Sequence, residues 1–423
     1  MKRVVITGIG VVAPCGVGRN EFWAQLLQGK SYVRRDDEMV ELGIKSSVLA
    51  RNDSFRPETW FAEAHDRWLL DEDRFVQFGV LAGRQAMQDA RLLPPIADPE
   101  DAGIISATAI GGTPTVSATW EKLTQLGKVP LEYRPCGPAL HHAASSNFPG
   151  SVIMREFGLE GPCAALSTGC TAGLDAIGLA FDHIRSGDAS VMVAGASEAP
   201  LAKISYATLD AIGALSVAEG EPQTRSRPFD ATRAGFVLGE GAAFLVLEEL
   251  EHARRRGVSI YCEVLSFASV SNAFHMSDLP AEGQPMTKVI RSAIDGAAID
   301  PRTVDYINAH GSSTAQNDIF ETNAYKQIFG AHAYRIPISS TKSMIGHSLS
   351  SASVMGAVAA IGAIKLRMVH PTINLNHPDP ACDLDYVPGV ARSAQVDTTL
   401  ITASGFGGIH SAAVFRKLGE SYV

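Results

Sequence analysis

The chain has 423 residues, of which 46% are hydrophobic and 19% are charged, a composition typical of a compact globular protein that excludes a disordered or fibrous one. This length is sufficient for two ordinary domains or for one large duplicated fold. The formal net charge of −9 argues against nucleic acid or an anionic membrane as the main partner, because both favour a cationic surface.

The N-terminal segment MKRVVITGIGVVAPCG is interpreted as a strand and a turn, because its apolar run is too short for a signal peptide and Pro14 and Gly16 follow it. The longest apolar stretch, residues 354–364, ends at Lys365, well short of the ~20 residues that span a bilayer. The cysteines form no CxxC pair and no zinc-finger spacing with histidine. We therefore expect a soluble, cytoplasmic protein with reduced thiols and no metal site.

Short apolar runs bounded by Gly, Asp or Ser recur along the chain and predict strands that are buried on both faces. Helical patterns alternate with these runs, which indicates an α/β layered structure. The predicted strands are 4–6, 103–106, 190–194, 243–247, 306–308, 336–339 and 400–403, and the predicted helices are 74–89, 174–185, 284–297 and 352–366.

Two predicted helices carry Ala, Gly and Ser where Leu would be usual: TAGLDAIGLAF after Cys170 and SSASVMGAVAAIGAIKL after His347. Small side chains allow a helix to approach a sheet or another helix closely, so we expect both at the centre of the fold. Each follows a strand and a turn that bears a reactive residue type. This parallel, with a break near Gly257, suggests two similar halves, 1–257 and 258–423, although their sequence identity is too low to establish a repeat.

Two glycine-rich segments match nucleotide-binding loops only superficially. GIGVVA at residues 8–13 matches part of the dinucleotide fingerprint, but Pro14 and Gly16 interrupt the helix that should follow. GFVLGEGAAF, which begins at Gly235, lacks the Lys and Ser/Thr of a P-loop. Neither segment predicts a nucleotide site.

Cys170 stands in ALSTGCTAGLDAIG, where an extended stretch gives way to a helix. There the thiol would lie beside unpaired N–H groups at the positive end of the helix dipole, which lowers the pKa of a thiol and favours the thiolate. On position alone, a structural cysteine is the simpler interpretation. If Cys170 is instead a nucleophile, we expect its thiol to be ionised and exposed at the tip of this turn.

Other reactive side chains also follow predicted strands. NAHGSSTAQND places His310 after one strand, and SSTKSMIGHSLSSAS places Lys342 and His347 around another strand-to-helix turn. A lone histidine is more often structural. Two histidines in Gly/Ser-rich turns, together with Cys170, favour a nucleophile surrounded by hydrogen-bond donors.

A glycine-rich turn follows the last predicted strand. The segment ASGFGGIHSAAV places Gly405, Phe406, Gly407 and Gly408 there. Glycines leave backbone N–H groups free to point at an oxyanion, and they do not obstruct a thioester carbonyl. This turn is therefore a candidate oxyanion-binding loop.

The motifs TGCTAGLD, SRPFDATRAGFVLGEGAAF, NAHGSSTAQNDIFET, SSTKSMIGHS and SGFGG occur in this order over almost the whole chain. Together they closely resemble the β-ketoacyl synthases, which condense acyl carrier protein thioesters. STGCTAGLDAIG, SNAFHMSDL, HGSSTAQNDIFET and DPACDLDYVP are similar to the ketosynthase alpha subunit of type II polyketide synthases. The resemblance implies the thiolase fold, five-layered α/β/α/β/α with two pseudo-duplicated halves, the first bearing the cysteine and the second both histidines.

The resemblance also implies roles for the candidate residues. Cys170 would accept the acyl chain as a thioester, and His310 and His347 would bind the malonyl thioester carbonyl and support loss of carbon dioxide. The backbone N–H groups of Cys170 and Phe406 would form an oxyanion hole, and the Phe406 ring would gate the acyl pocket. Lys342 would orient His310.

Two acidic residues complete the implied site. Asp318 and Glu321 match family positions that hold the network around the histidines, although a purely structural salt-bridge role is equally compatible with their positions. Four residues depart from the pattern: Ser350 and Ser353 replace Gly, and Ile409 and His410 replace Thr-Asn or Phe-Gln. These departures affect the expected substrate size and subgroup rather than the reaction.

The resemblance implies that no cofactor is needed, because the substrates arrive on the phosphopantetheine arm of acyl carrier protein. A chain-length factor, which resembles the alpha subunit but lacks the cysteine, would be the partner in a heterodimer. The alternative is a homodimeric fatty-acid elongating synthase with the same chemistry. Thiolases use a second, late cysteine and chalcone-synthase-like enzymes carry Asn in place of His347, so both are disfavoured. A catalytically inactive scaffold is disfavoured by Cys170, His310, His347 and Lys342 together.

Overall fold

The computed structural model describes residues 1–132, 134–280 and 282–419. Its centre is an 11-stranded sheet in which ten strands follow the order β12-β11-β15-β16-β10-β1-β9-β7-β5-β6 and β2 pairs with β1. The strands are β1 (Val4–Ala13), β2 (Gly16–Val17), β5 (Ala102–Ala107), β6 (Cys163–Leu166), β7 (Val191–Glu198), β9 (Gly241–Glu249), β10 (Cys262–Ser271), β11 (Tyr306–Asn308), β12 (Ile338–Ser339), β15 (Thr398–Gly405) and β16 (Ile409–Arg416).

The sheet consists of two runs of five strands with the same topology. Outward from β1 the order is β1-β9-β7-β5-β6, and outward from β10 it is β10-β16-β15-β11-β12. In each run, counted along the chain, the first strand is followed in the sheet by the fifth, the fourth, the second and the third. In both runs the first two pairings are antiparallel and the last two are parallel. Antiparallel pairing of β1 with β10 joins the runs. The internal duplication is confirmed by topology, whereas the boundary at 257/258 stays a prediction.

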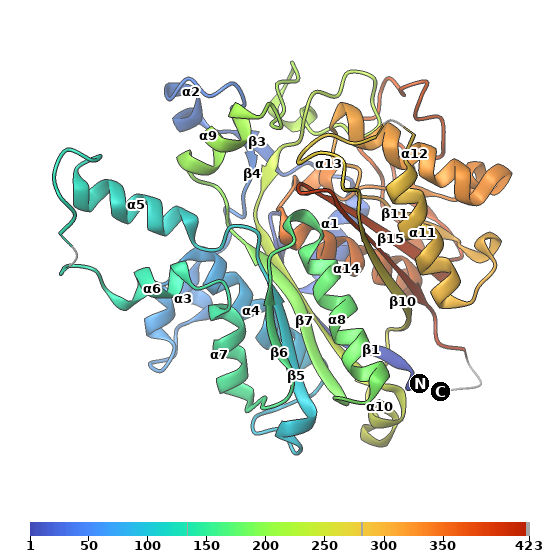
Figure 1. Cartoon of the computed structure of the whole chain (residues 1–423), viewed down its shortest axis with the longest axis horizontal. Coiled ribbons are helices and arrows are strands. Elements are labelled where there is room, and N and C mark those ends of the chain that lie inside the picture. Colours follow the sequence, from blue (N-terminus) through green and yellow to red (C-terminus); the bar gives the residue numbers. More distant parts are fainter. Residues whose placement is uncertain (133, 281, 420–423) are drawn as a thin grey trace.

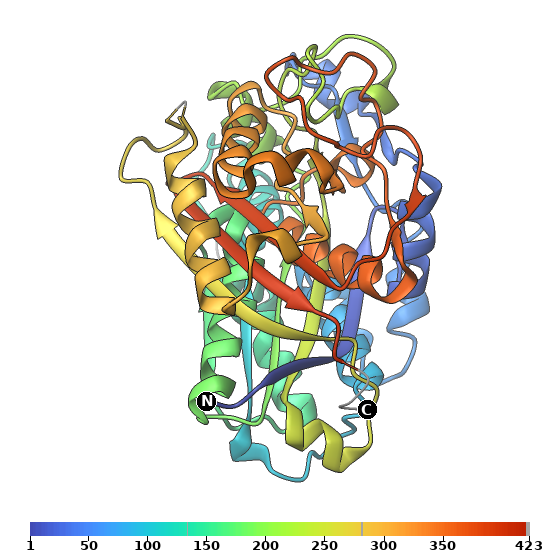
Figure 2. The same cartoon turned by 90° about the vertical axis from the view of Figure 1, so that its right-hand side faces the viewer.

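Helices form three layers around the two halves of the sheet (Figures 1 and 2). Helix α4 (Arg74–Asp89) contacts β1, β7 and β9 on one outer face, and α11 (Gln284–Ala297) contacts β10 and β16 on the other, beside α12 (Ala315–Phe329). Helices α8 (Ala172–Ser186) and α14 (Ser350–Leu366) lie between the halves and contact each other. The five-layered arrangement is therefore as expected.

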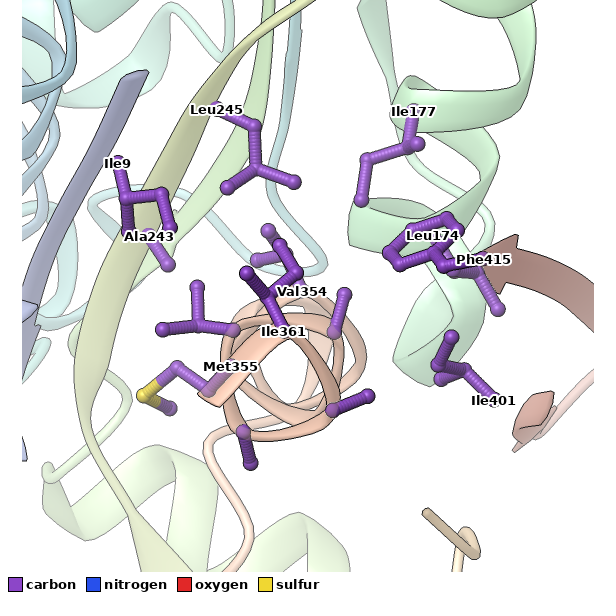
Figure 3. Packing of buried hydrophobic residues seen from close by; sticks show 14 of the residues in the cluster. Ile9, Leu174, Ile177, Ala243, Leu245, Val354, Met355, Ile361, Ile401 and Phe415 are labelled. Atoms are coloured by element: carbon purple, nitrogen blue, oxygen red, sulfur yellow. The ribbon is translucent and has the colours of Figure 1, made fainter. Parts of the chain in front are cut away.

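The two central helices form the main core of the molecule. Figure 3 shows the side chains of α14 packed among residues of β1, β9, β15, β16 and α8. Close approach depends on small residues: a Cβ at Gly173 of α8 would lie 2.7 Å from the backbone oxygen of Ser350. The small-residue pattern thus positions the turn before α8 against the start of α14.

The predicted strands and helices are all present, with ends that shift by several residues. Helix α4 begins where expected because the Asp73 carboxylate accepts a hydrogen bond from the Phe75 N–H at 2.8 Å. The remaining helices and strands are α1 (Arg19–Gln28), β3 (Val33–Arg35), α2 (Asp37–Glu41), β4 (Val48–Ala50), α3 (Pro57–Trp60), α5 (Thr113–Thr124), α6 (Pro138–Ala144), α7 (Phe148–Phe157), α9 (Lys203–Ala211), β8 (Leu238–Gly239), α10 (Leu250–Arg256), α13 (Lys342–Ile345), β13 (Met368–Val369) and β14 (Arg392–Ser393). Within the residues that the structure describes, no helix is both long and apolar enough to cross a bilayer.

Candidate active site

A cavity of about 310 Å³ brings together five of the residues singled out in the sequence. Cys170, His310, His347, Gly405 and Phe406 all line it, although they come from four segments that are far apart along the chain. Cys170 comes from the first half of the fold, and the other four come from the second. The cavity therefore lies where the halves meet.

Cys170 lies in the 3₁₀ turn Gly169–Thr171, immediately before α8. The residue is only 7% exposed. Burial raises the pKa of the Cys170 thiol to about 12, while the positive charge of Lys342 acts in the opposite direction and the Glu198 carboxylate raises it further. The prediction of an exposed thiolate is therefore wrong for the free chain. The loss of solvation raises the pKa of the thiol more than the helix terminus lowers it, so the resting sulfur is protonated.

The glycine loop after β15 lies directly against this turn. A Cβ at Gly405 would be 3.3 Å from the Cys170 nitrogen, and the Phe406 N–H lies close enough to the sulfur to lower the pKa of the thiol. The glycine loop therefore brings the Phe406 N–H to the Cys170 sulfur, and its Gly405 lies beside the Cys170 nitrogen.

Two further glycines shape the loop. Gly407 and Gly408 have φ angles of 89° and 76°, a region that favours glycine. The Gly407 N–H donates to the Met276 carbonyl at 2.7 Å, and a Cβ at Gly408 would lie 2.1 Å from Oδ1 of Asn272. The loop is thus held against the segment that follows β10.

The two histidines lie side by side and are neutral. Their ring centroids are 5.2 Å apart with an interplanar angle of 79°. Burial holds the pKa of both His310 and His347 well below its ordinary value, and the positive charge of Lys342 lowers both further. Two neutral imidazoles can therefore donate hydrogen bonds into the cavity without carrying a charge.

Lys342 and Glu321 fix the turn that carries His310. The Lys342 ammonium donates to the His310 carbonyl oxygen at 2.5 Å, and burial lowers the pKa of this lysine to about 8. The Glu321 carboxylate accepts the N–H groups of His310 at 2.9 Å and Gly311 at 2.7 Å. Neither Lys342 nor Glu321 lines the cavity. Their contacts are with the backbone of the histidine turn.

Asp318 lies one layer further from the cavity. Its carboxylate accepts the Phe229 N–H at 2.8 Å and is 3.4 Å from Nε of Arg233, and Arg233 also binds Asp379 at 2.7 Å. Burial raises the pKa of Asp318 to about 6. The contacts of Asp318 therefore join α12 to neighbouring loops.

The sequence interpretation missed Glu198, which ends β7 and is fully buried. Its carboxylate accepts the N–H groups of Ala109 at 2.6 Å and Ile110 at 3.2 Å, and the hydroxyl of Ser350 at 2.5 Å. Ser350, one of the departures from the family pattern, is thus the partner of a buried acid. The sequence signal that could have identified Glu198 was a single carboxylate at the end of the mostly apolar strand β7, VMVAGASE.

The other departures lie at two different contacts. The Ser353 hydroxyl accepts the Leu174 N–H at 3.1 Å, between α14 and α8. Ile409 and His410 begin β16, and Nδ1 of the fully buried His410 lies 3.1 Å from Oγ of Ser404, a cavity-lining residue that the sequence did not single out. Within the described part of the chain, no group of three or more His, Cys, Asp or Glu residues is arranged to hold a metal ion.

Comparison with known proteins identifies the family. The models for the beta-ketoacyl synthase N-terminal and C-terminal domains match residues 1–253 and 261–376. A putative polyketide beta-ketoacyl synthase 1 from Streptomyces halstedii is 44% identical, over 98% of this chain and 97% of its own length. The 3-oxoacyl-[acyl-carrier-protein] synthase 2 of Coxiella burnetii is 37% identical, over 99% of each chain.

Solved structures give the same assignment. A type II polyketide synthase acyl-carrier protein in complex with its ketosynthase, bound to the hexaketide, contains a chain with a TM-score of 0.92 and 42% identity, covering 99% of this chain and 100% of that one. The ishigamide ketosynthase/chain length factor gives a TM-score of 0.88 at 31% identity, with the same coverage. The chain therefore belongs to the β-ketoacyl synthase family of thiolase-fold condensing enzymes, which are acyltransferases.

Proposed function

We propose that this chain is the ketosynthase alpha subunit of a type II polyketide synthase, which catalyses decarboxylative Claisen condensation of malonyl-acyl carrier protein onto an acyl chain bound to Cys170. The observation that carries the proposal is the single cavity lined by Cys170, His310, His347 and Phe406. It combines a nucleophile, two neutral donors and two backbone N–H groups, the set that acyl transfer followed by decarboxylation requires.

Loading of the acyl chain is the first step. The Cys170 sulfur attacks the thioester carbonyl of the carrier-bound chain, the new sulfur–carbon bond forms, and the bond to the pantetheine sulfur breaks. The proton of the thiol ends on the departing pantetheine sulfur, because Cys170 starts protonated. After the new bond forms and before the old one breaks, the N–H groups of Cys170 and Phe406 stabilise the oxyanion of the tetrahedral intermediate. Each donor of this kind increases the rate on the order of 10²–10³-fold.

Condensation is the second step. His310 and His347 donate hydrogen bonds to the malonyl thioester oxygen, so that loss of carbon dioxide leaves an enolate held by neutral donors. The enolate carbon attacks the acyl-Cys170 carbonyl, the new carbon–carbon bond forms, and the sulfur–carbon bond breaks to release the Cys170 thiolate, which takes a proton from water to regenerate the resting thiol. Neutral imidazoles suit this step because they stabilise the enolate without protonating it. Lys342 and Glu321 keep His310 in place.

The first prediction separates the two steps. Cys170→Ala should abolish acyl loading and leave decarboxylation of malonyl carrier protein, because both histidines remain. Intact-protein mass spectrometry measures the acyl adduct, and release of carbon dioxide measures decarboxylation. His310→Ala is the matched control, with loading retained and decarboxylation reduced. An acyl adduct on Cys170→Ala protein would contradict the assignment.

We further propose acyl carrier protein as the substrate-bearing partner and a chain-length factor as the heterodimer partner. Relatives of this chain are named for such assemblies: one solved relative is a ketosynthase with its acyl-carrier protein and another is a ketosynthase/chain length factor. Co-purification with an unlike, cysteine-lacking subunit is the expected result. A stable homodimer that elongates saturated acyl chains would instead support the fatty-acid alternative.

The proposed reaction uses no separate cofactor, because the phosphopantetheine arm of the carrier protein delivers both substrates.

We also propose a cytoplasmic location. The six cysteines are all unpaired in the structure, an arrangement typical of a reducing compartment. Activity that persists in a thiol reductant and without added metal or nucleotide is the expected outcome of a reconstitution with malonyl carrier protein.

A further inference from the structure

A serine and a histidine form a buried pair in the wall of the cavity. Ser404 and His410 face each other across the β15–β16 hairpin, with Oγ of Ser404 3.1 Å from Nδ1 of His410. Ser404 lines the cavity, whereas His410 is fully buried behind it, 5.1 Å from the Phe320 ring between ring centroids. The mechanism above uses neither residue.

The hydrogen-bond partners of His410 determine which atom carries its proton. Nε2 is buried and has no partner among the described residues. Burial lowers the pKa of His410 to about 4, so the ring is neutral and carries one N–H. An unpaired buried N–H costs more than an unpaired lone pair, which favours the proton on Nδ1. Nδ1 then donates to Oγ of Ser404, and the Ser404 hydroxyl proton is left to point elsewhere.

The other hydroxyls that line the cavity have partners of their own: Oγ of Ser277 lies 3.4 Å from Nδ1 of His275, and Ser312 and Thr314 pair with each other, which leaves one of their two hydroxyl protons unused. The Ser312 and Thr314 hydroxyls lie 2.8 Å apart, Ser312 accepts the Thr314 N–H and Thr314 accepts the Asn317 N–H. Among the described residues, the one hydrogen-bond partner of the Ser404 hydroxyl is His410. Ser404 is therefore a donor prepared for a ligand in the cavity.

The charge of the cavity wall indicates which ligand atom this donor suits. The cavity-lining residues of the described chain include no lysine or arginine, and they do include the exposed acidic residue Asp278, although the malonyl substrate brings a carboxylate into the cavity. A cation would stabilise that carboxylate in the ground state and oppose its loss as carbon dioxide. A neutral hydroxyl can orient the carboxylate at a smaller cost to the decarboxylation barrier.

We propose that the Ser404 hydroxyl donates a hydrogen bond to the carboxylate of the malonyl unit and that His410 is a positioning residue that fixes this hydroxyl. The inference rests on the proposed function and adds a specificity-determining contact to it. Because the charge that Ser404 contacts leaves during the reaction, the contact stabilises the bound substrate more than the transition state.

The test measures malonyl binding and acyl loading separately, using the ketosynthase together with its partner subunit. Ser404→Ala should raise KM for malonyl carrier protein roughly tenfold, the effect of losing one hydrogen bond to a charged group, without lowering kcat. Acylation of Cys170 in the absence of malonyl carrier protein, followed by mass spectrometry, should be unchanged. His410→Leu should reproduce the effect, and His410→Gln, which keeps a donor, should restore most of the affinity.

A matched control comes from the same strand. Thr399 of β15 is buried and its hydroxyl has no partner among the described residues, but it does not line the cavity, so Thr399→Val should leave both KM and loading unchanged. An unchanged KM for malonyl carrier protein in Ser404→Ala would overturn the inference, and so would a loss of acyl loading that accompanies the rise in KM. In either case, condensation by the unmodified enzyme would still uphold the proposed function. Failure of the unmodified enzyme to condense would overturn both. If His410→Leu does not fold, Ser404→Ala and His410→Gln still decide the question.

Discussion

At the residue scale, the state of Cys170 is set by two opposing influences. The start of α8 favours a thiolate, whereas burial beside Glu198 disfavours it, and the result is a pKa of about 12 against an ordinary value of 9.0. With the pKa raised in this way, the thiol is protonated at neutral pH. In the proposed mechanism, the cysteine would become nucleophilic only when a bound thioester and the oxyanion donors lower the cost of the charge, and this would limit side reactions of the free enzyme.

The second prediction follows from this pKa. Alkylation of Cys170 by iodoacetamide should accelerate about tenfold for each pH unit from pH 6 to pH 8, because only the thiolate reacts. Above that range the slope should lessen, since Lys342, with a pKa lowered to about 8, loses the positive charge that stabilises the thiolate. Peptide mass spectrometry follows Cys170 separately from the more accessible Cys136 and Cys163. A rate that is flat between about pH 6 and pH 8 would indicate a preformed thiolate.

Glu321 provides the third prediction. It accepts the N–H groups of His310 and Gly311 and the hydroxyls of Tyr325 and Thr402, so its removal leaves several buried donors without a partner. Glu321→Ala should lower the free energy of unfolding by about 2–5 kcal/mol and reduce decarboxylation. Glu321→Gln, which keeps one acceptor oxygen, should be milder in both respects. Chemical denaturation and carbon dioxide release measure the two effects, and equal behaviour of the variants would argue against this network.

At the element scale, the contact between α8 and α14 sets the distance between the cysteine and histidine sides of the cavity. Cys170 lies in the turn immediately before α8, and His347 lies just before α14. The helices approach closely because Gly173 presents no side chain to the backbone of Ser350. The two reactive segments are therefore positioned by one helix pair rather than by their own loops.

The fourth prediction tests this contact. Gly173→Ala places a Cβ about 2.7 Å from the Ser350 oxygen and should force the helices apart, with a loss of about 1–3 kcal/mol in unfolding free energy and a fall in kcat. Gly296→Ala in α11 is the control, because the nearest atom to its Cβ would be 3.4 Å away. Alanine favours a helix by about 1 kcal/mol over glycine, so the control should be stabilised. Equal melting temperatures for the two variants would show that the close approach is unimportant.

At the scale of the whole molecule, the two topologically equivalent halves share one core. The central cluster contains Leu174 and Ile177 of α8 together with Val354 and Ile361 of α14, and the sheet is continuous through β1 and β10 (Figure 3). Neither half can bury its central helix without the other. The two halves therefore form one continuous core, with the cavity at their junction.

The fifth prediction concerns this dependence. Residues 1–257 produced alone should not show a cooperative unfolding transition in urea, because α8 would expose the apolar face that packs on α14. Coexpression with residues 258–423 should restore a soluble, cooperatively unfolding complex. Circular dichroism during denaturation distinguishes the outcomes. A cooperative transition for the isolated first half would show that the halves are independent domains.

The sequence by itself determined the α/β class, seven strands of the central sheet and the helices α4, α8, α11 and α14, with ends that differ by several residues. These features follow from local patterns: apolar runs at the strands, small residues in α8 and α14, and glycine where the loop after β15 needs positive φ angles. Family motifs then placed Cys170, His310, His347, Lys342 and Phe406 in one expected site.

Only the tertiary structure decided how these side chains are charged and supported. The protonation of Cys170 depends on burial and on Glu198, which lies 28 positions away along the printed sequence and meets it only in the folded chain. The pairing of Ser404 with His410 likewise depends on hairpin register and on what surrounds the ring. Solvation and electrostatic interactions act through space between elements that local patterns do not relate, so they emerge only once the halves have packed together.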